Sequence, residues 1–221
     1  GQSSMRGDER WWMHEQIQLF RRFGQSRADG GLDYDWRALL IEICKDRAML
    51  DWLDGTNSAK GRPNENFARE LWELFMLGEG RGYTQADIEE AARAFTGFDD
   101  VDVENTDPVY QTVIYFLDRH DEEEKTIFGV TGRFGYDNVA PYHEGSATTA
   151  TDARDTDGGI VALTLRERPV EGSTFICRKL FDWFVYENPP QAVIDQLAAT
   201  MVNNNYDVAP VLKQMFRSEA F

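Results

Sequence analysis

Two amphipathic segments joined by a short glycine-containing loop constrain the fold of this chain more than any other feature. The first segment begins after Asn64, a residue type that often caps helices, and ends at Gly78, which can adopt a left-handed helix stop. The second begins at Thr84, has Asp87 three residues later as in a capping box, and ends at Gly97. Because the connection is short, the pattern predicts two helices packed as an αα-hairpin.

The apolar residues of both segments recur at helical spacing. They are Phe67, Leu71, Leu74 and Phe75 in the first segment and Ile88, Ala91, Ala92 and Phe95 in the second. Trp72 and Met76 fall off the first stripe, so we expect this helix to contact further helices or another chain.

Helical patterns also occupy both ends of the chain. They cover residues 11–23, residues 36–53 with a break near Asp46, residues 159–165, residues 172–185, a helix opened by Pro189-Pro190 and a last helix capped by Asp207. The sequence therefore predicts a mainly α, compact multi-helix domain of about seven or eight helices, spanning residues 1–221 as a single unit.

The middle of the chain changes character. Val109–Leu117 is rich in β-branched and aromatic residues, which favour a strand. We expect it to pair with Thr126–Val130, giving a small β-hairpin at about residues 109–130. The acidic stretch Asp99–Asp107 is interpreted as a loop, and residues 132–158 as an irregular excursion, because Gly, Ala, Thr and Asp dominate there.

Composition narrows the classes of function. The 221 residues carry a formal net charge of −16, so the average surface repels polyphosphate and argues against nucleic acid as a partner. No apolar run is long enough for a membrane helix, so we expect no membrane insertion. The acidic balance slightly favours an extracytoplasmic location, and Cys44 and Cys177 are expected to be buried free thiols.

An ordered series of short motifs carries a family resemblance. The motifs are residues 63–71 (PNENFAREL), Leu77-Gly78, Tyr83-Thr84, Asp87 and residues 92–97 (ARAFTG), with weaker likeness at Phe116, His120-Asp121, Lys125, Gly129 and residues 175–180. This series closely resembles the signature of the bacterial domain of unknown function 1800 family. The resemblance covers roughly residues 11–221 and is weakest at residues 139–156.

The resemblance implies a helical fold without an assigned reaction. Members of that family usually carry a tryptophan- and histidine-bearing segment before this region and a further helical portion after it, so the chain looks like the central portion of a typical member. Members often accompany a second family resembling sulfatases and phosphatases, which implies an accessory role.

Polar residues near the start of the first hairpin helix exceed what a hairpin requires. They are Glu65, Asn66, Arg69 and Glu70, to which Arg93 of the second helix can be added. Glu65 and Arg69 are four residues apart, so a solvated surface ladder explains part of the set. Alternatively, the set forms a buried polar network, or a site in which a carboxylate acts as base or ligand.

The metal-ligand types are sparse. His14, His120 and His143 lack a partner at the spacing of a helical zinc motif, although His120 can act as ligand or proton carrier if the fold brings Glu65 or Glu70 close. The acidic loops offer hard oxygens for calcium or another divalent cation, without EF-hand spacing. The candidate residues there are Asp100, Asp102, Asp155 and Asp157.

Two functions remain open from the sequence. The first is a non-catalytic accessory or assembly subunit that acts through protein–protein contacts, with a protein partner or a homo-oligomer. The second is a metal-assisted hydrolase that uses carboxylates near Glu65, Glu70 and His120. Whether the chain is an enzyme is left undecided.

Overall fold

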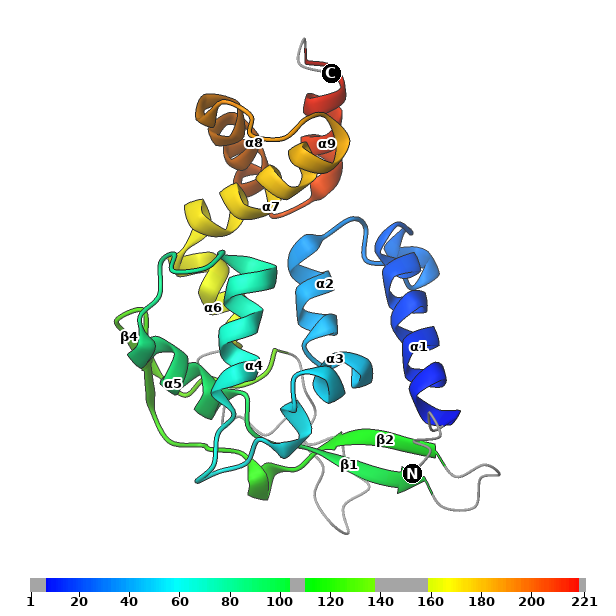
Figure 1. The fold of residues 1–221 in the computed structure, drawn as a ribbon, viewed down its shortest axis with the longest axis vertical. Helices are drawn as coiled ribbons and strands as arrows, with labels where there is room; N and C mark the ends of the chain where they lie inside the picture. Colours follow the sequence, from blue (N-terminus) through cyan, green and yellow to red (C-terminus); the bar gives the residue numbers. More distant parts are fainter. Residues whose placement is uncertain (1–6, 104–109, 138–158, 219–221) are drawn as a thin grey trace.

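The computed structural model describes residues 7–103, 110–137 and 159–218, and within these ranges the chain is mainly helical, as predicted (Figure 1). The helices are α1 (Gly7–Phe23), α2 (Trp36–Ile43), α3 (Arg47–Trp52), α4 (Glu65–Glu70), α5 (Gln85–Ala94), α6 (Ile160–Glu167), α7 (Pro169–Phe184), α8 (Gln191–Asn203) and α9 (Val208–Phe216). The strands are β1 (Phe98–Val103), β2 (Tyr110–Tyr115), β3 (Lys125–Ile127) and β4 (Val130–Gly132). The mainly α fold with small β-hairpins is therefore confirmed.

The predicted αα-hairpin is present, with the caps that its sequence indicates. The side chain of Asn64 accepts a hydrogen bond from the backbone N–H of Asn66 at the start of α4. At the start of α5, Thr84 and Asp87 form a reciprocal capping box. Gly78 ends the first helical segment with a φ of +91°. These local bonds hold both helix starts before any tertiary contact is counted.

The first helix of the hairpin departs from the expected register. After α4 the chain continues as a π-helical turn, η3 (Leu71–Met76), in which each residue advances by a smaller angle than in an α-helix. Trp72 and Met76 are therefore turned fully into the core, whereas Leu74, which the α-helical pattern placed on the buried stripe, is 44% exposed. Trp72 packs against the rings of Tyr83 and Phe128.

The strands pair differently from the prediction. The strand expected at Val109–Leu117 exists as β2, but its antiparallel partner is β1, with Phe98 opposite Tyr115. Thr126–Val130 does not pair with it, because these residues supply β3 and the start of β4, a second two-stranded hairpin. The interpretation of Asp99–Asp107 as a loop is wrong for its first part, residues 99–103.

Arginines explain why acidic residues are tolerated in β1. Asp99 pairs with Arg119 at 2.5 Å, and Asp100 pairs with Arg47 at 2.8 Å. Aspartate is disfavoured in strands when it is considered alone, so the composition indicated a loop. The arginines that neutralise it come from distant parts of the chain and are not visible in the local pattern.

The last three helices, α7 to α9, form a lobe at one end of the molecule, and the β1–β2 hairpin lies at the other (Figure 1). Backbone bonds tie the lobe to the start of the chain. Trp36 N–H donates to the Tyr206 carbonyl at 3.0 Å, and Val208 N–H donates to the Tyr34 carbonyl at 3.0 Å. The Tyr206 hydroxyl donates to the carbonyl of Leu165. The lobe is thus anchored by more than the α6–α7 connection.

The expected irregular excursion lies mostly outside the described residues. Its first residues are described, and they return the chain to the core: Phe134 and Tyr136 are buried, and Asp137 accepts hydrogen bonds from Val161 N–H and Ala162 N–H at the start of α6. No helix in the described ranges is long and apolar enough to cross a bilayer.

Candidate functional site

The polar residues at the start of α4 form a ladder that reaches α5. Glu65 and Arg69 form an ion pair at 3.5 Å. The side chain of Gln85 donates to Glu65 at 2.8 Å and accepts from Arg69 at 2.8 Å. Asn66 is exposed beside this group, and Glu70 is half-buried. The ladder joins the two helices of the hairpin at the surface, where such contacts contribute a few tenths of a kcal/mol each.

Arg93 belongs to a second, more buried network. Its Nε–H donates to Asp121 at 2.8 Å, and its Nη1 donates to both carboxylate oxygens of Glu90 at 3.0 and 2.8 Å. Glu90 in turn accepts from the backbone N–H of Thr126 at 3.0 Å. The network therefore fixes the segment before β3 against α5.

His120 lies inside the same network and is 1% exposed. Its Nδ1 is 2.9 Å from the carbonyl oxygen of Thr96 and 3.3 Å from the Thr96 hydroxyl. The Thr96 hydroxyl donates to the Arg93 carbonyl and accepts from Asp121 N–H. The buried ammonium of Lys125 donates to the carbonyls of Asp121 and Glu123. These bonds give hydrogen-bond partners to polar groups that are buried away from water, as a stable fold requires.

The charges of this network shift the pKa values of its ionisable groups. Burial raises the pKa of Asp121, but hydrogen bonds from Arg93 and from Glu123 N–H, with the charges of Arg93 and Lys125, outweigh burial and leave that pKa lowered. The hydrogen bond to Asp121 raises the pKa of Arg93, against the opposing effect of burial. Both groups are thus held in their charged forms.

The structure divides the predicted site residues into these two groups. Arg93 and His120 share Thr96, whereas Glu65 and Arg69 share Gln85. Among the proposed cation ligands, Asp100 pairs with Arg47, whereas the side chain of Asp102, and Asp155 and Asp157 altogether, lie outside the described residues, as does His143. In the described ranges, no three His, Cys, Asp or Glu side chains are grouped as a metal ion would require.

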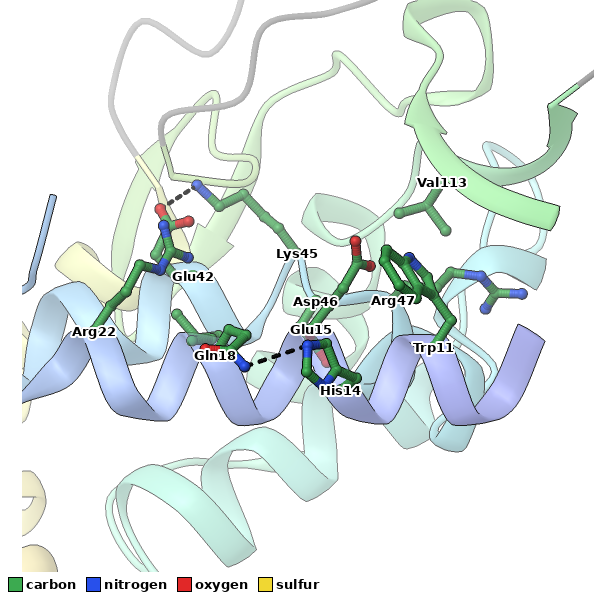
Figure 2. A pocket seen from close by; sticks show the side chains of 11 residues that line it. Trp11, His14, Glu15, Gln18, Arg22, Glu42, Lys45, Asp46, Arg47 and Val113 are labelled. Atoms are coloured by element: carbon green, nitrogen blue, oxygen red, sulfur yellow. Dashed lines mark hydrogen bonds and ion pairs between the residues drawn. The ribbon is translucent and has the colours of Figure 1, made fainter. Parts of the chain in front are cut away.

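A cleft of about 600 Å³ lies between α1 and the α2–α3 junction, a site that the sequence reasoning missed (Figure 2). Trp11, His14, Glu15, Gln18, Leu19 and Arg22 line it from α1, and Glu42, Lys45, Asp46, Arg47 and Val113 line it from the facing elements. A signal was available in the sequence: Trp11, Glu15, Gln18 and Arg22 recur at i, i+4, i+7 and i+11.

The facing wall of the cleft has mixed charge. Glu42 and Lys45 pair at 2.8 Å. Asp46 caps α3 by accepting from Met49 N–H, as the predicted break near this residue requires, and accepts from Gln16 at 2.7 Å. Burial raises the pKa of Asp46, and the negative charge of Glu15 adds to this effect against the hydrogen bonds. The Arg47 guanidinium stacks on Trp12 at 3.8 Å from the ring centre.

Comparison with known proteins places the chain in a family. The family model described as "Protein of unknown function (DUF1800)" matches residues 3–221, nearly the whole chain. The chain belongs to the DUF1800 family. No curated protein and no solved structure gives a significant match. The resemblance drawn from the sequence motifs is thereby confirmed, and the DUF1800 description adds no reaction.

The motifs behind the DUF1800 resemblance have structural roles in this chain. The side chain of Asn64 donates to the carbonyls of Leu53 and Asp54, tying the start of α4 to the end of α3. Asp87 caps α5 and also accepts from the backbone N–H of Phe128, which has a left-handed φ of +55°. These residues hold loops to helices, and their chemistry is accounted for by folding.

The first helix of this DUF1800 chain presents apolar side chains to solvent. Trp12 and Leu19 are buried, but Met13 is 50%, Ile17 46% and Phe20 50% exposed. The three exposed side chains occur at i, i+4 and i+7, so they form one face on the outer side of α1.

Proposed function

We propose that this DUF1800 chain is an accessory or assembly subunit that works through protein contacts, with the outer face of α1 as its contact surface. Three half-exposed large apolar side chains on one helix, Met13, Ile17 and Phe20, are the observation that carries the proposal. Apolar side chains scattered singly over a surface need no explanation, but three in one stripe expose on the order of 300 Å² of contiguous area. A protein partner that covers this stripe would remove its apolar area from water.

Charge beside the stripe supports an acidic partner. Arg10 and Arg21 lie seven residues before and four residues after Ile17, so both flank the apolar face, and both are exposed. No ion pair of either arginine is found in the described part of the chain. The surface therefore suits an amphipathic helix whose apolar stripe is bordered by glutamate or aspartate.

A second copy of this chain fits the face less well. Two such faces together would bury roughly 600 Å², about half of what the smaller stable interfaces bury. The flanking arginines would also bring like charges into one interface. The small area limits any partner that covers only this stripe, but a different chain with acidic flanks avoids the repulsion between like charges.

Binding of designed peptides tests the proposal. One peptide carries leucine at i, i+4 and i+7 with flanking glutamates, and a matched peptide carries lysines in place of the glutamates. Fluorescence anisotropy is expected to show tighter binding of the acidic peptide by about tenfold or more, because only that peptide pairs with Arg10 and Arg21. The preference should shrink as salt is added.

Matched variants locate the binding surface. Replacement of Met13, Ile17 and Phe20 together by Gln should abolish binding, whereas Trp183→Gln, at a side chain 83% exposed on α7, should leave it unchanged. Equal binding of both peptides, or binding that survives the triple replacement, would refute the assignment. Self-association in sedimentation velocity that the triple variant removes would instead identify a second copy as the occupant.

A further inference from the structure

The cleft between α1 and the α2–α3 junction is polarised along its length. In Figure 2 Arg22 and Glu42 lie at one end, Trp11 and Arg47 lie at the other, and Glu15 and Asp46 lie between them. This side of α1 differs from the outer apolar face, so what binds here is independent of the proposed protein contact.

Half of the charged side chains that line the cleft already have an ionic partner. Lys45 pairs with Glu42 at 2.8 Å, and Arg47 pairs with Asp51 at 3.3 Å and Asp100 at 2.8 Å. The charges of Glu42, Lys45 and Arg47 are therefore neutralised within the protein, without a bound ligand.

Three charges are left without an ionic partner among the described residues. Arg22 and Glu15 are exposed, with no ion pair, and Asp46 accepts hydrogen bonds only from the Gln16 amide and from backbone N–H groups. One end of the cleft is thus cationic through Arg22, and the middle is anionic through Glu15 and Asp46. A group bearing a positive charge is favoured at the second place and a negative group at the first.

We propose that this cleft binds a small extended zwitterion with the chemistry of a short peptide, its ammonium group at Glu15 and Asp46 and its carboxylate at Arg22. Gln18 lies between Glu15 and Arg22 on the same stripe; its Nε2 is 3.3 Å from His14 Nε2, and its amide oxygen can accept from the ligand's own peptide N–H groups. The indole of Trp11, 54% exposed, offers an apolar face at the ammonium end.

The spacing of the free charges determines the length of the ligand. Glu15 and Arg22 are seven residues apart on α1, a rise of about 10 Å. An extended chain advances about 3.3–3.6 Å per residue, so about three residues separate an ammonium and a carboxylate by that distance. The volume of about 600 Å³ lies within the usual range for small-molecule sites.

Titration with trialanine, followed by chemical-shift changes in the protein's amide spectrum, tests the inference. N-acetyl-trialanine lacks the ammonium and trialanine amide lacks the carboxylate, so each should bind about three- to tenfold more weakly than trialanine. Dialanine and tetra-alanine test the expected ligand length, and both should bind more weakly than trialanine. The shifted amides should belong to α1 and to the α2–α3 junction.

Two exposed substitutions assign each end. Glu15→Gln should weaken trialanine but not its N-acetyl form, and Arg22→Gln should weaken trialanine but not its amide. Glu79→Gln and Arg81→Gln, which remove the same charges from an exposed loop elsewhere, should change nothing. The inference is overturned if trialanine causes no shift in the cleft at about 10 mM, or if the blocked peptides bind as well as the free one. It is equally overturned if the loop variants weaken binding as much as the cleft variants, because the effect would then be net charge alone.

Discussion

Arg93 and Asp121 are joined by two parallel hydrogen bonds, from Nε at 2.8 Å and from Nη2 at 3.2 Å. The fork-shaped guanidinium matches the carboxylate at both oxygens, a geometry that lysine does not reproduce. Since Asp121 lies just before β3 and Arg93 lies on α5, this pair connects the α-hairpin to the loop that contains His120.

Asp121→Asn is expected to lower the free energy of unfolding by about 1–3 kcal/mol at pH 7, since it leaves Arg93 partly unpaired. Because the folded-state pKa of Asp121 is lowered, its contribution is present above the unfolded pKa of about 3.9 and is lost as pH falls through the folded value. Urea melts from pH 7 to pH 3 should therefore show the variant approaching the native protein in acid. Glu123→Gln, in an exposed pair with Lys60 at 3.8 Å, is the control and should cost less than about 0.5 kcal/mol.

Asp137→Asn should show the opposite dependence on pH. Burial raises the pKa of Asp137 despite hydrogen bonds from Val161 N–H and Ala162 N–H. The folded state then binds a proton more tightly than the unfolded state, so wild-type stability rises as pH falls through the raised pKa toward about 3.9. Asparagine can still accept at the start of α6 but does not titrate. The free energy of unfolding of the native protein should therefore rise relative to that of the variant as the pH falls from 7 to 4. A difference between the two proteins that does not change with pH would contradict this expectation.

Trp72→Phe is expected to destabilise the protein by about 1–3 kcal/mol, because the Trp72 indole N–H donates to the Thr164 hydroxyl at 3.0 Å inside the core. A double-mutant cycle with Thr164→Val measures this bond, and a coupling of about 0.5–1.5 kcal/mol is expected. Trp183→Phe, at the surface of α7, should be nearly neutral. Strict additivity of the two core changes would rule out the bond as a source of stability.

The thiols of Cys44 and Cys177 should resist modification in the folded protein. Both are buried and free, as predicted, and burial raises the pKa of Cys177 to about 12 and that of Cys44 still further. Almost no thiolate exists at pH 8, so reaction with a disulfide reagent should follow the rate of unfolding. Two thiols should react at once in urea. Rapid labelling of one thiol without urea would show that the structure around that thiol opens locally.

Local signals in the sequence predicted the helix boundaries well where a cap or a stop is a short-range event. Thr84 with Asp87, Asp46 and Asp207 all cap helices where the sequence places them, because each bond spans two or three residues. The π-helical turn was not predicted, because its residues advance by a smaller angle than α-helical spacing assumes. Leu74 was consequently assigned to the wrong side.

The site was less predictable than the fold because its residues meet only in space. The local sequence around Asp99 and Asp100 favours a loop, and only the folded chain brings Arg119 and Arg47 close enough to neutralise them in a strand. The sequence pattern groups Arg93 with the polar residues at the start of α4 and links His120 to a nearby glutamate. In the structure Arg93 and His120 instead meet through Thr96 and Asp121, and no spacing along the chain indicated that meeting. The cleft needs α1 and the α2–α3 junction at once, and no single stretch of sequence contains both.

The backbone bonds from Trp36 to Tyr206 and from Val208 to Tyr34 also have a consequence for the order of events during synthesis. A ribosome delivers the residues around Tyr34 long before those around Tyr206, so these bonds form only after all the residues between them have been synthesised. Closing so long a loop is entropically costly and slow relative to forming the local α-hairpin. Until Tyr206 is synthesised, α2 of the nascent chain therefore has Trp36 exposed to solvent. We expect chaperones to bind the nascent chain mainly during this interval.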